Sequence, residues 1–193
     1  MSLIEWPAAS AEAEAIFARD AENLGFVMNA SRLWAHQPKL RQQLFDMLDD
    51  LADEHDLTFR QRAILVLACA STLGDSYCSV AWGTKLSQQT DPETAAGILR
   101  GTDKGLSPAE HALAQWARKV TSDPNNTSAA DIQMLRDAGW TDHQIFGITA
   151  FVALRLAFST VNDALGAHPD ASYRSLTPNP VLKAVTYGRP LDD

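Results

Sequence analysis

The sequence contains few of the features that cross-link a chain or anchor it in a membrane. It has two cysteines, Cys69 and Cys78, and no CxxC pair, so we expect no disulfide between them. Its five histidines stand singly, which argues against a metal site, and no motif indicates another cofactor. The longest apolar run, residues 63–70, falls far short of the roughly 20 residues that span a bilayer. The first residues lack the basic flank and apolar stretch of a signal peptide, so we expect a cytoplasmic protein without a membrane partner.

Basic residues are also in the minority. The chain carries 16 Lys and Arg against 24 Asp and Glu, which gives a formal net charge of −8. Phosphate backbones are bound by clustered basic side chains, so nucleic acid is not an expected partner. With 193 residues, 46% of them hydrophobic, the chain is long enough to bury a core of its own.

Alternating strand patterns are absent as well, and helix signals take their place. Capping boxes pair a Ser or Thr with an acidic or amide residue three positions later, and they begin at Thr58, Ser107, Ser128 and Thr141. Each precedes apolar residues at helical spacing. Residues 63–70 are apolar on nearly all sides of a helix, which is typical of a buried central helix. The sequence therefore predicts an all-α bundle of roughly eight helices.

The organisation predicted is one domain over residues 1–193. Its N-terminal helix lies within residues 1–24, where Ser10 is a good N-cap and Gly25 a good helix terminator. Residues 169–193 contain four prolines and few apolar residues, and we expect them to form an extended arm.

Several short segments resemble, in their order and spacing, the alkyl hydroperoxidase D / carboxymuconolactone decarboxylase family and its peroxidase-related branch. They include residues 25–29, 58–62, 74–78, 137–142 and 162–166. The likeness spans residues 25–170. It implies an AhpD-like helical fold, a homo-oligomer such as a dimer or hexamer, and antioxidant reduction of hydroperoxides of the peroxiredoxin type.

The catalytic motif of that family is largely missing here. The family pattern has a Glu on the buried helix, a CxxC at the start of the next helix, and a His four residues after the second Cys. In this chain the second Cys falls on Cys78, but the first falls on Asp75, the His on Trp82 and the Glu on Ala63. Tyr77 is retained. The resemblance thus makes Cys78 the candidate nucleophile, with an external thiol as its reductant.

The chemistry at Cys78 depends on opposing effects. A helix N-terminus favours the thiolate, which is the form that attacks a peroxide. Asp75 is most simply an N-cap, and its alternative role is that of a carboxylate base, although its charge would raise the pKa of a nearby thiol. We therefore expect the pKa of Cys78 to lie near its ordinary value of about 8.5. Trp82 is interpreted as a plug in the space of the missing imidazole. Tyr77 is a further candidate site residue.

Arg155 stands in an apolar stretch of the sequence and needs a partner if it is buried. Asp75 and Asp163 are the partners considered.

Three functions remain open from the sequence. The first is a weakened, one-cysteine peroxidase. The second is a non-redox member, either a lyase or a small-molecule binder with a Trp-lined pocket. The third is a non-catalytic scaffold that keeps the fold and its oligomer. The missing His, Glu and second Cys count against the first and permit the others.

Overall fold

The computed structural model describes residues 2–192, and every regular element among them is helical. The expected all-α class is confirmed. The elements are α1 (Ala11–Leu24), α2 (Asn29–Trp34), α3 (Pro38–Glu54), α4 (Phe59–Leu73), α5 (Ser76–Ser87), α6 (Pro92–Arg100), α7 (Pro108–Ser122), the short 3₁₀ turn Pro124–Asn126, α8 (Ala129–Asp137), α9 (Asp142–Leu165), α10 (Tyr173–Leu176) and α11 (Asn179–Ala184). Eight of these α-helices have seven or more residues, which matches the expected number of substantial helices.

The capping signals form as the sequence predicts. At Thr58, Ser107, Ser128 and Thr141 the side chain accepts a hydrogen bond from the backbone three residues on, and the reciprocal bond is present. Two backbone donors are thus satisfied at each of these helix starts, which fixes where α4, α7, α8 and α9 begin.

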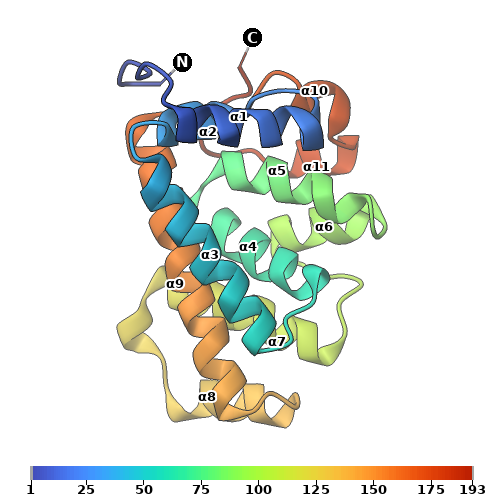
Figure 1. Cartoon of the computed structure of the whole chain (residues 1–193). Helices are drawn as coiled ribbons and strands as arrows, with labels where there is room; N and C mark the ends of the chain where they lie inside the picture. Colours follow the sequence, from blue (N-terminus) through green and yellow to red (C-terminus); the bar gives the residue numbers. More distant parts are fainter. Residues whose placement is uncertain (1, 193) are drawn as a thin grey trace.

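Helix α4 lies at the centre of the bundle (Figure 1). Its residues 63–70 are all buried, and it packs against α5, α6, α7 and α9. The long helices α3 and α9 run side by side along one flank, while α1 crosses one end together with the C-terminal helices (Figure 1). Within residues 2–192, only α9 is long and apolar enough to cross a membrane, judged by length and composition alone. The core helices of soluble proteins meet the same criterion.

The expectation of an extended C-terminal arm is wrong, because α10 and α11 form within it. Tertiary packing explains the difference. Val181 of α11 is fully buried, and its Cγ1 lies 2.6 Å from where a Cβ on Gly83 would be, so the absence of a side chain on α5 admits α11. Pro180 falls in the first turn of α11, where a missing N–H costs nothing. At the other end of the chain, the expected N-terminal helix occupies only Ala11–Leu24 and is capped by Ser10.

Candidate functional site

The start of α5 is built by its cap. Gly74 ends α4 in the left-handed region, with φ of 83°, and the chain turns directly into α5. Asp75 then caps α5, and its Oδ1 accepts a 2.8 Å hydrogen bond from the Cys78 N–H. The N-cap interpretation of Asp75 is confirmed. Because Asp75 is fully buried, its carboxylate and the Cys78 thiol share one water-poor region.

Two side chains of α9 reach the sulfur of Cys78. Arg155 Nη2 donates to Sγ across 3.3 Å, and Ser159 Oγ lies 3.6 Å from it. The expected pairing of Arg155 with Asp75 or Asp163 is wrong, since Arg155 makes no ion pair within 4.0 Å among the described residues. Its Nε is buried without a hydrogen-bond partner. Arg155 is thus a buried cation that donates to the Cys78 sulfur instead of pairing with a carboxylate.

The electrostatics of the site favour the thiol over the thiolate. Burial raises the pKa of Cys78 well above its ordinary range, and the negative charge of Asp75 raises it further. Arg155 and Ser159 act in the opposite direction but do not prevail. The expectation that the pKa of Cys78 lies near its ordinary value is therefore wrong, because the pKa is raised well above it. Cys78 is only 2% exposed, and the desolvation of its thiol outweighs the effect of the helix terminus.

Tyr77 lines a cavity that Cys78 also lines, and its hydroxyl bonds to two segments outside α5. Its hydroxyl donates to Asp170 Oδ2 across 2.6 Å and accepts from the Ala30 N–H across 3.1 Å. Burial raises its pKa well above the ordinary value, so the phenol stays protonated. Both hydrogen bonds connect α5 to neighbouring segments, and they orient the helix that carries Cys78.

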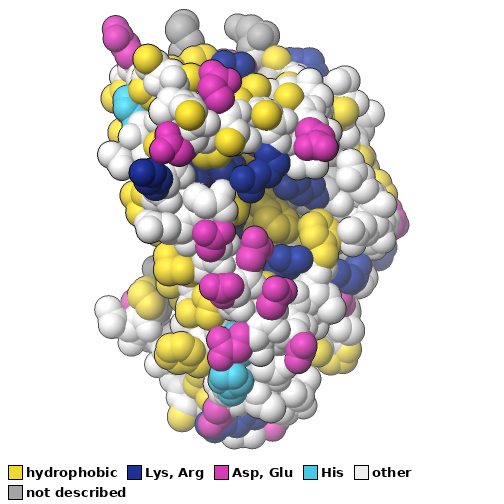
Figure 2. Space-filling model, viewed as in Figure 1, with side chains coloured by type: hydrophobic (Ala, Val, Ile, Leu, Met, Phe, Trp, Pro, Cys, Tyr) yellow, Lys and Arg dark blue, Asp and Glu magenta, His cyan; other side chains and the backbone are white. Residues whose placement is uncertain are grey.

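A cavity of about 480 Å³ opens over Cys78, between α1, α3, α5 and α9. Trp82 lines this cavity without filling it, because its indole is stacked on Phe59 with the ring centroids 5.8 Å apart. Phe45 and Phe158 add further aromatic wall. Figure 2 shows apolar side chains inside a hollow on this face, with Lys and Arg side chains along one edge. The interpretation of Trp82 as a plug is therefore wrong, because Trp82 forms part of the wall of an open cavity.

The cations of this cavity exceed its anions. Arg19, Arg41, Lys85 and Arg155 line it, whereas the acidic side chains that line it are Asp20 and Asp49.

Two of these cations, the buried Arg41 and the half-buried Lys85, form no ion pair within residues 2–192. Arg41 is 8% exposed, its Nε has no partner, and its guanidinium lies over the Phe45 ring. Lys85 lies 5.3 Å from the centre of the Trp82 ring and has no carboxylate within 4.0 Å in the described part of the chain. Burial lowers the pKa of both groups. The cavity therefore carries desolvated positive charge.

Sequence reasoning missed this basic lining. The net charge of −8 conceals it, and Arg41 comes from α3, far from α5 along the chain. One pattern could have revealed part of it. Cys78, Trp82 and Lys85 are spaced four and three residues apart, which places them on one face of a helix.

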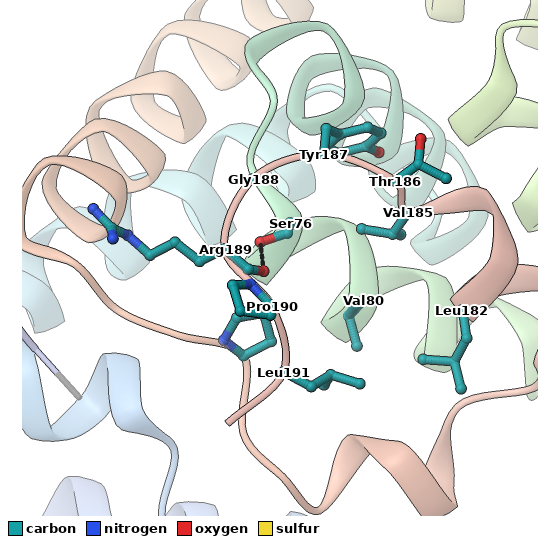
Figure 3. Close-up of a pocket in the computed structure, with 11 residues that line it drawn as sticks. Ser76, Val80, Leu182, Val185, Thr186, Tyr187, Gly188, Arg189, Pro190 and Leu191 are labelled. Carbon is teal, nitrogen blue, oxygen red and sulfur yellow. Dashed lines mark hydrogen bonds between the residues drawn. The ribbon is translucent and has the colours of Figure 1, made fainter. Parts of the chain in front are cut away.

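The C-terminal segment covers the start of α5. A second cavity, of about 340 Å³, lies between them, and Figure 3 shows residues 185–191 passing over Ser76. Ser76 Oγ donates to the Arg189 carbonyl across 2.7 Å, and Ser79 Oγ lies 3.0 Å from Tyr187 Oη. Gly188 allows the close approach, because a Cβ there would lie 2.5 Å from the Gly74 carbonyl oxygen. The segment thus packs against the residues on both sides of Asp75, which is itself fully buried.

Comparison with known proteins identifies the fold. No protein-family model and no curated protein match the sequence. Among solved structures, a peroxidase-related protein from Ralstonia eutropha JMP134 with an alkylhydroperoxidase AhpD core is 24% identical, with a TM-score of 0.80 over 89% of this chain and 94% of that chain. A peroxidase-related protein from Silicibacter sp. TM1040 is also 24% identical, with a TM-score of 0.80 over 89% and 93%.

A third similar structure has a different activity. The debrominase Bmp8, solved as a cysteine-to-alanine variant in complex with 2,3,4-tribromopyrrole, is 16% identical, with a TM-score of 0.69 over 91% of each chain. The chain therefore has the AhpD-like fold that its sequence resembles, and this fold carries more than one activity.

Proposed function

We propose that this protein binds a small organic anion in the 480 Å³ cavity, with the Cys78 thiol at the cavity wall. The observation that carries the proposal is a pair of cations, the buried Arg41 and the half-buried Lys85, that line the cavity and have no carboxylate within 4.0 Å among the described residues. An unpaired buried charge is costly, and an anionic ligand would compensate both.

The rest of the cavity suits an apolar and planar ligand body. Its volume falls in the range of about 300–1,000 Å³ that is usual for small-molecule sites. Trp82, Phe45 and Phe158 offer ring faces and edges on which a planar group can stack. The ligand class is thus an aromatic or otherwise unsaturated carboxylate, or a heterocycle that is acidic enough to be an anion at neutral pH.

A matched pair of probes tests this proposal. We expect 1-naphthoate to bind more tightly than the uncharged 1-naphthamide in titration calorimetry. Replacing Lys85 with Met should weaken naphthoate binding by about tenfold or more, since a charge-assisted contact contributes about 1.5–3 kcal/mol. Lys183→Met, an exposed change on α11 away from the cavity, should leave binding unchanged. Equal affinities for the two probes, or equal binding by the two variants, would contradict the proposal.

One-cysteine hydroperoxide reduction is the second candidate, and the Arg155 donor on the Cys78 sulfur favours it. In that reaction the thiolate attacks the terminal peroxide oxygen, the O–O bond breaks, and the alcohol leaves with the proton that the thiol gave up. The resulting sulfenic acid is reduced by two equivalents of an external thiol, which yield a disulfide and water. Because the pKa of Cys78 is raised, we expect this step to be slow at pH 7.

Mass spectrometry after one equivalent of hydrogen peroxide distinguishes the two functions. Slow, incomplete oxidation of Cys78 is the result expected from its raised pKa and would leave the binding site as the favoured function, whereas rapid stoichiometric sulfenic acid formation at pH 7 would overturn that expectation and favour the peroxidase.

A further inference from the structure

Two histidines that stand far apart in the sequence meet where α3 ends and α9 begins. His55 is the C-cap of α3 and His143 is the second residue of α9, and their ring centroids lie 4.3 Å apart. Glu54 Oε1 lies 3.7 Å from His143 Nε2. One ring nitrogen from each histidine and one carboxylate oxygen of Glu54 all lie within 4.8 Å of one another. Figure 2 shows histidine and acidic side chains together low on this face.

His55 is held rigidly in this cluster. Helix α3 ends in a Schellman motif, in which Asp56 adopts a φ of 54° and the Leu57 N–H donates to the Ala52 carbonyl across 2.8 Å. This turn directs the His55 ring onto α9, where Gly147 makes room. A Cβ on Gly147 would lie 2.0 Å from His55 Cδ2. The imidazole is therefore packed in place before any ligand binds.

The buried imidazole of His55 has a ring nitrogen without a hydrogen-bond partner in the described structure. His55 is 3% exposed, and its Nδ1 has no hydrogen-bond partner in the described structure. A buried polar atom without a partner costs free energy, and such exceptions call for an explanation. The side chains of Glu54 and His143 are 63% and 65% exposed, so they can rotate and an ion can reach them.

We propose that Glu54, His55 and His143 form a binding site for a divalent first-row transition-metal ion, with Zn²⁺ as the test ion. Two imidazoles and one carboxylate are the ligand set that such ions take, whereas Mg²⁺ and Ca²⁺ prefer oxygen ligands throughout. The negative end of the α3 dipole lies at the same point and favours a cation. None of the three residues lines the Cys78 cavity, so the site is separate from the proposed ligand site.

Calorimetry with untagged protein tests the site. We expect one Zn²⁺ per chain and a higher melting temperature with the ion than without it. His143→Ala and Glu54→Gln remove exposed ligands and should leave the fold intact, so each should weaken Zn²⁺ binding by about tenfold or more and reduce the thermal shift. His36→Ala removes another exposed histidine, outside the cluster, and should change neither.

Cobalt provides a second readout. Co²⁺ in place of Zn²⁺ should give a visible absorption band of a low-coordinate site, and the band should be lost in His143→Ala. Unchanged Zn²⁺ affinity in His143→Ala and Glu54→Gln, or equal losses in His36→Ala, would overturn the proposal and indicate adventitious surface binding.

Discussion

At the scale of the residue, Cys78 shows which properties a sequence can reveal and which it cannot. Its position at a helix start and the capping role of Asp75 are local, and the sequence predicts both. Its burial and its contact with Arg155 depend on α9, which is 77 residues away along the chain. A helix terminus stabilises an anion by at most about 2 kcal/mol, and here desolvation outweighs it. The reactivity of the thiol is thus set by tertiary structure.

Replacing Asp75 with Asn tests this electrostatic account. The amide oxygen can still cap α5, but the negative charge that raises the pKa of Cys78 is gone. In a Cys69→Ala background, the pH midpoint for alkylation by iodoacetamide should move to lower pH. Asp137→Asn, an exposed change on α8, serves as the control. An unchanged midpoint in Asp75→Asn would show that burial alone controls the thiol.

A second residue-scale prediction concerns Asp163, whose pKa is raised to about 7 by burial and by the charge of Asp75. The folded state therefore binds a proton that the unfolded state releases near pH 4, and stability should fall as pH rises from about 4 to about 7. Asp163→Asn should flatten this decline. Melting temperatures at about pH 5 and about pH 8 measure it, and parallel curves for variant and wild type would contradict the assignment.

At the scale of the element, the sequence predicts where the long helices begin, but it does not predict that helices form in the C-terminal segment. The capping boxes at Thr58, Ser107, Ser128 and Thr141 are written within four residues each, so sequence alone places them. Helices α10 and α11 are short, and short helices are marginal without tertiary contacts. Val181 forms such a contact with α5 at Gly83, and no local sequence pattern predicts that the two residues meet.

The contact between Val181 and Gly83 predicts a double-mutant effect. Val181→Ala should lower the free energy of unfolding by roughly 1–3 kcal/mol, because it leaves a gap against α5. Gly83→Ala should also destabilise, since its Cβ would meet Val181 Cγ1. In the double variant the new methyl group occupies the vacated space, and Ala suits a helix better than Gly. Urea unfolding should show the double variant to be more stable than Val181→Ala, and strict additivity would contradict this.

At the scale of the whole molecule, we propose that the chain forms a homo-oligomer, a dimer or a hexamer, as the family resemblance implies. Large apolar side chains remain exposed on its long helices, among them Leu40 at 51% and Met47 at 46% on α3 and Phe146 at 72% on α9. Light scattering should give a mass that is a multiple of 21.0 kDa at micromolar concentration. A single-chain mass would contradict the proposal.

The cover that residues 187–189 place over the start of α5 sets an order of events during protein synthesis. Ser76 and Arg189, which hydrogen-bond to each other, are 113 residues apart. At about 5–20 residues per second, a ribosome needs roughly 6–23 s to make the residues that separate them. For that interval the nascent chain lacks the contacts that residues 188 and 189 make with Ser76 and Gly74. A segment made much later than α5 therefore covers the start of the helix that carries Cys78, and a ribosome stalled before residue 187 would hold a bundle with that end still uncovered.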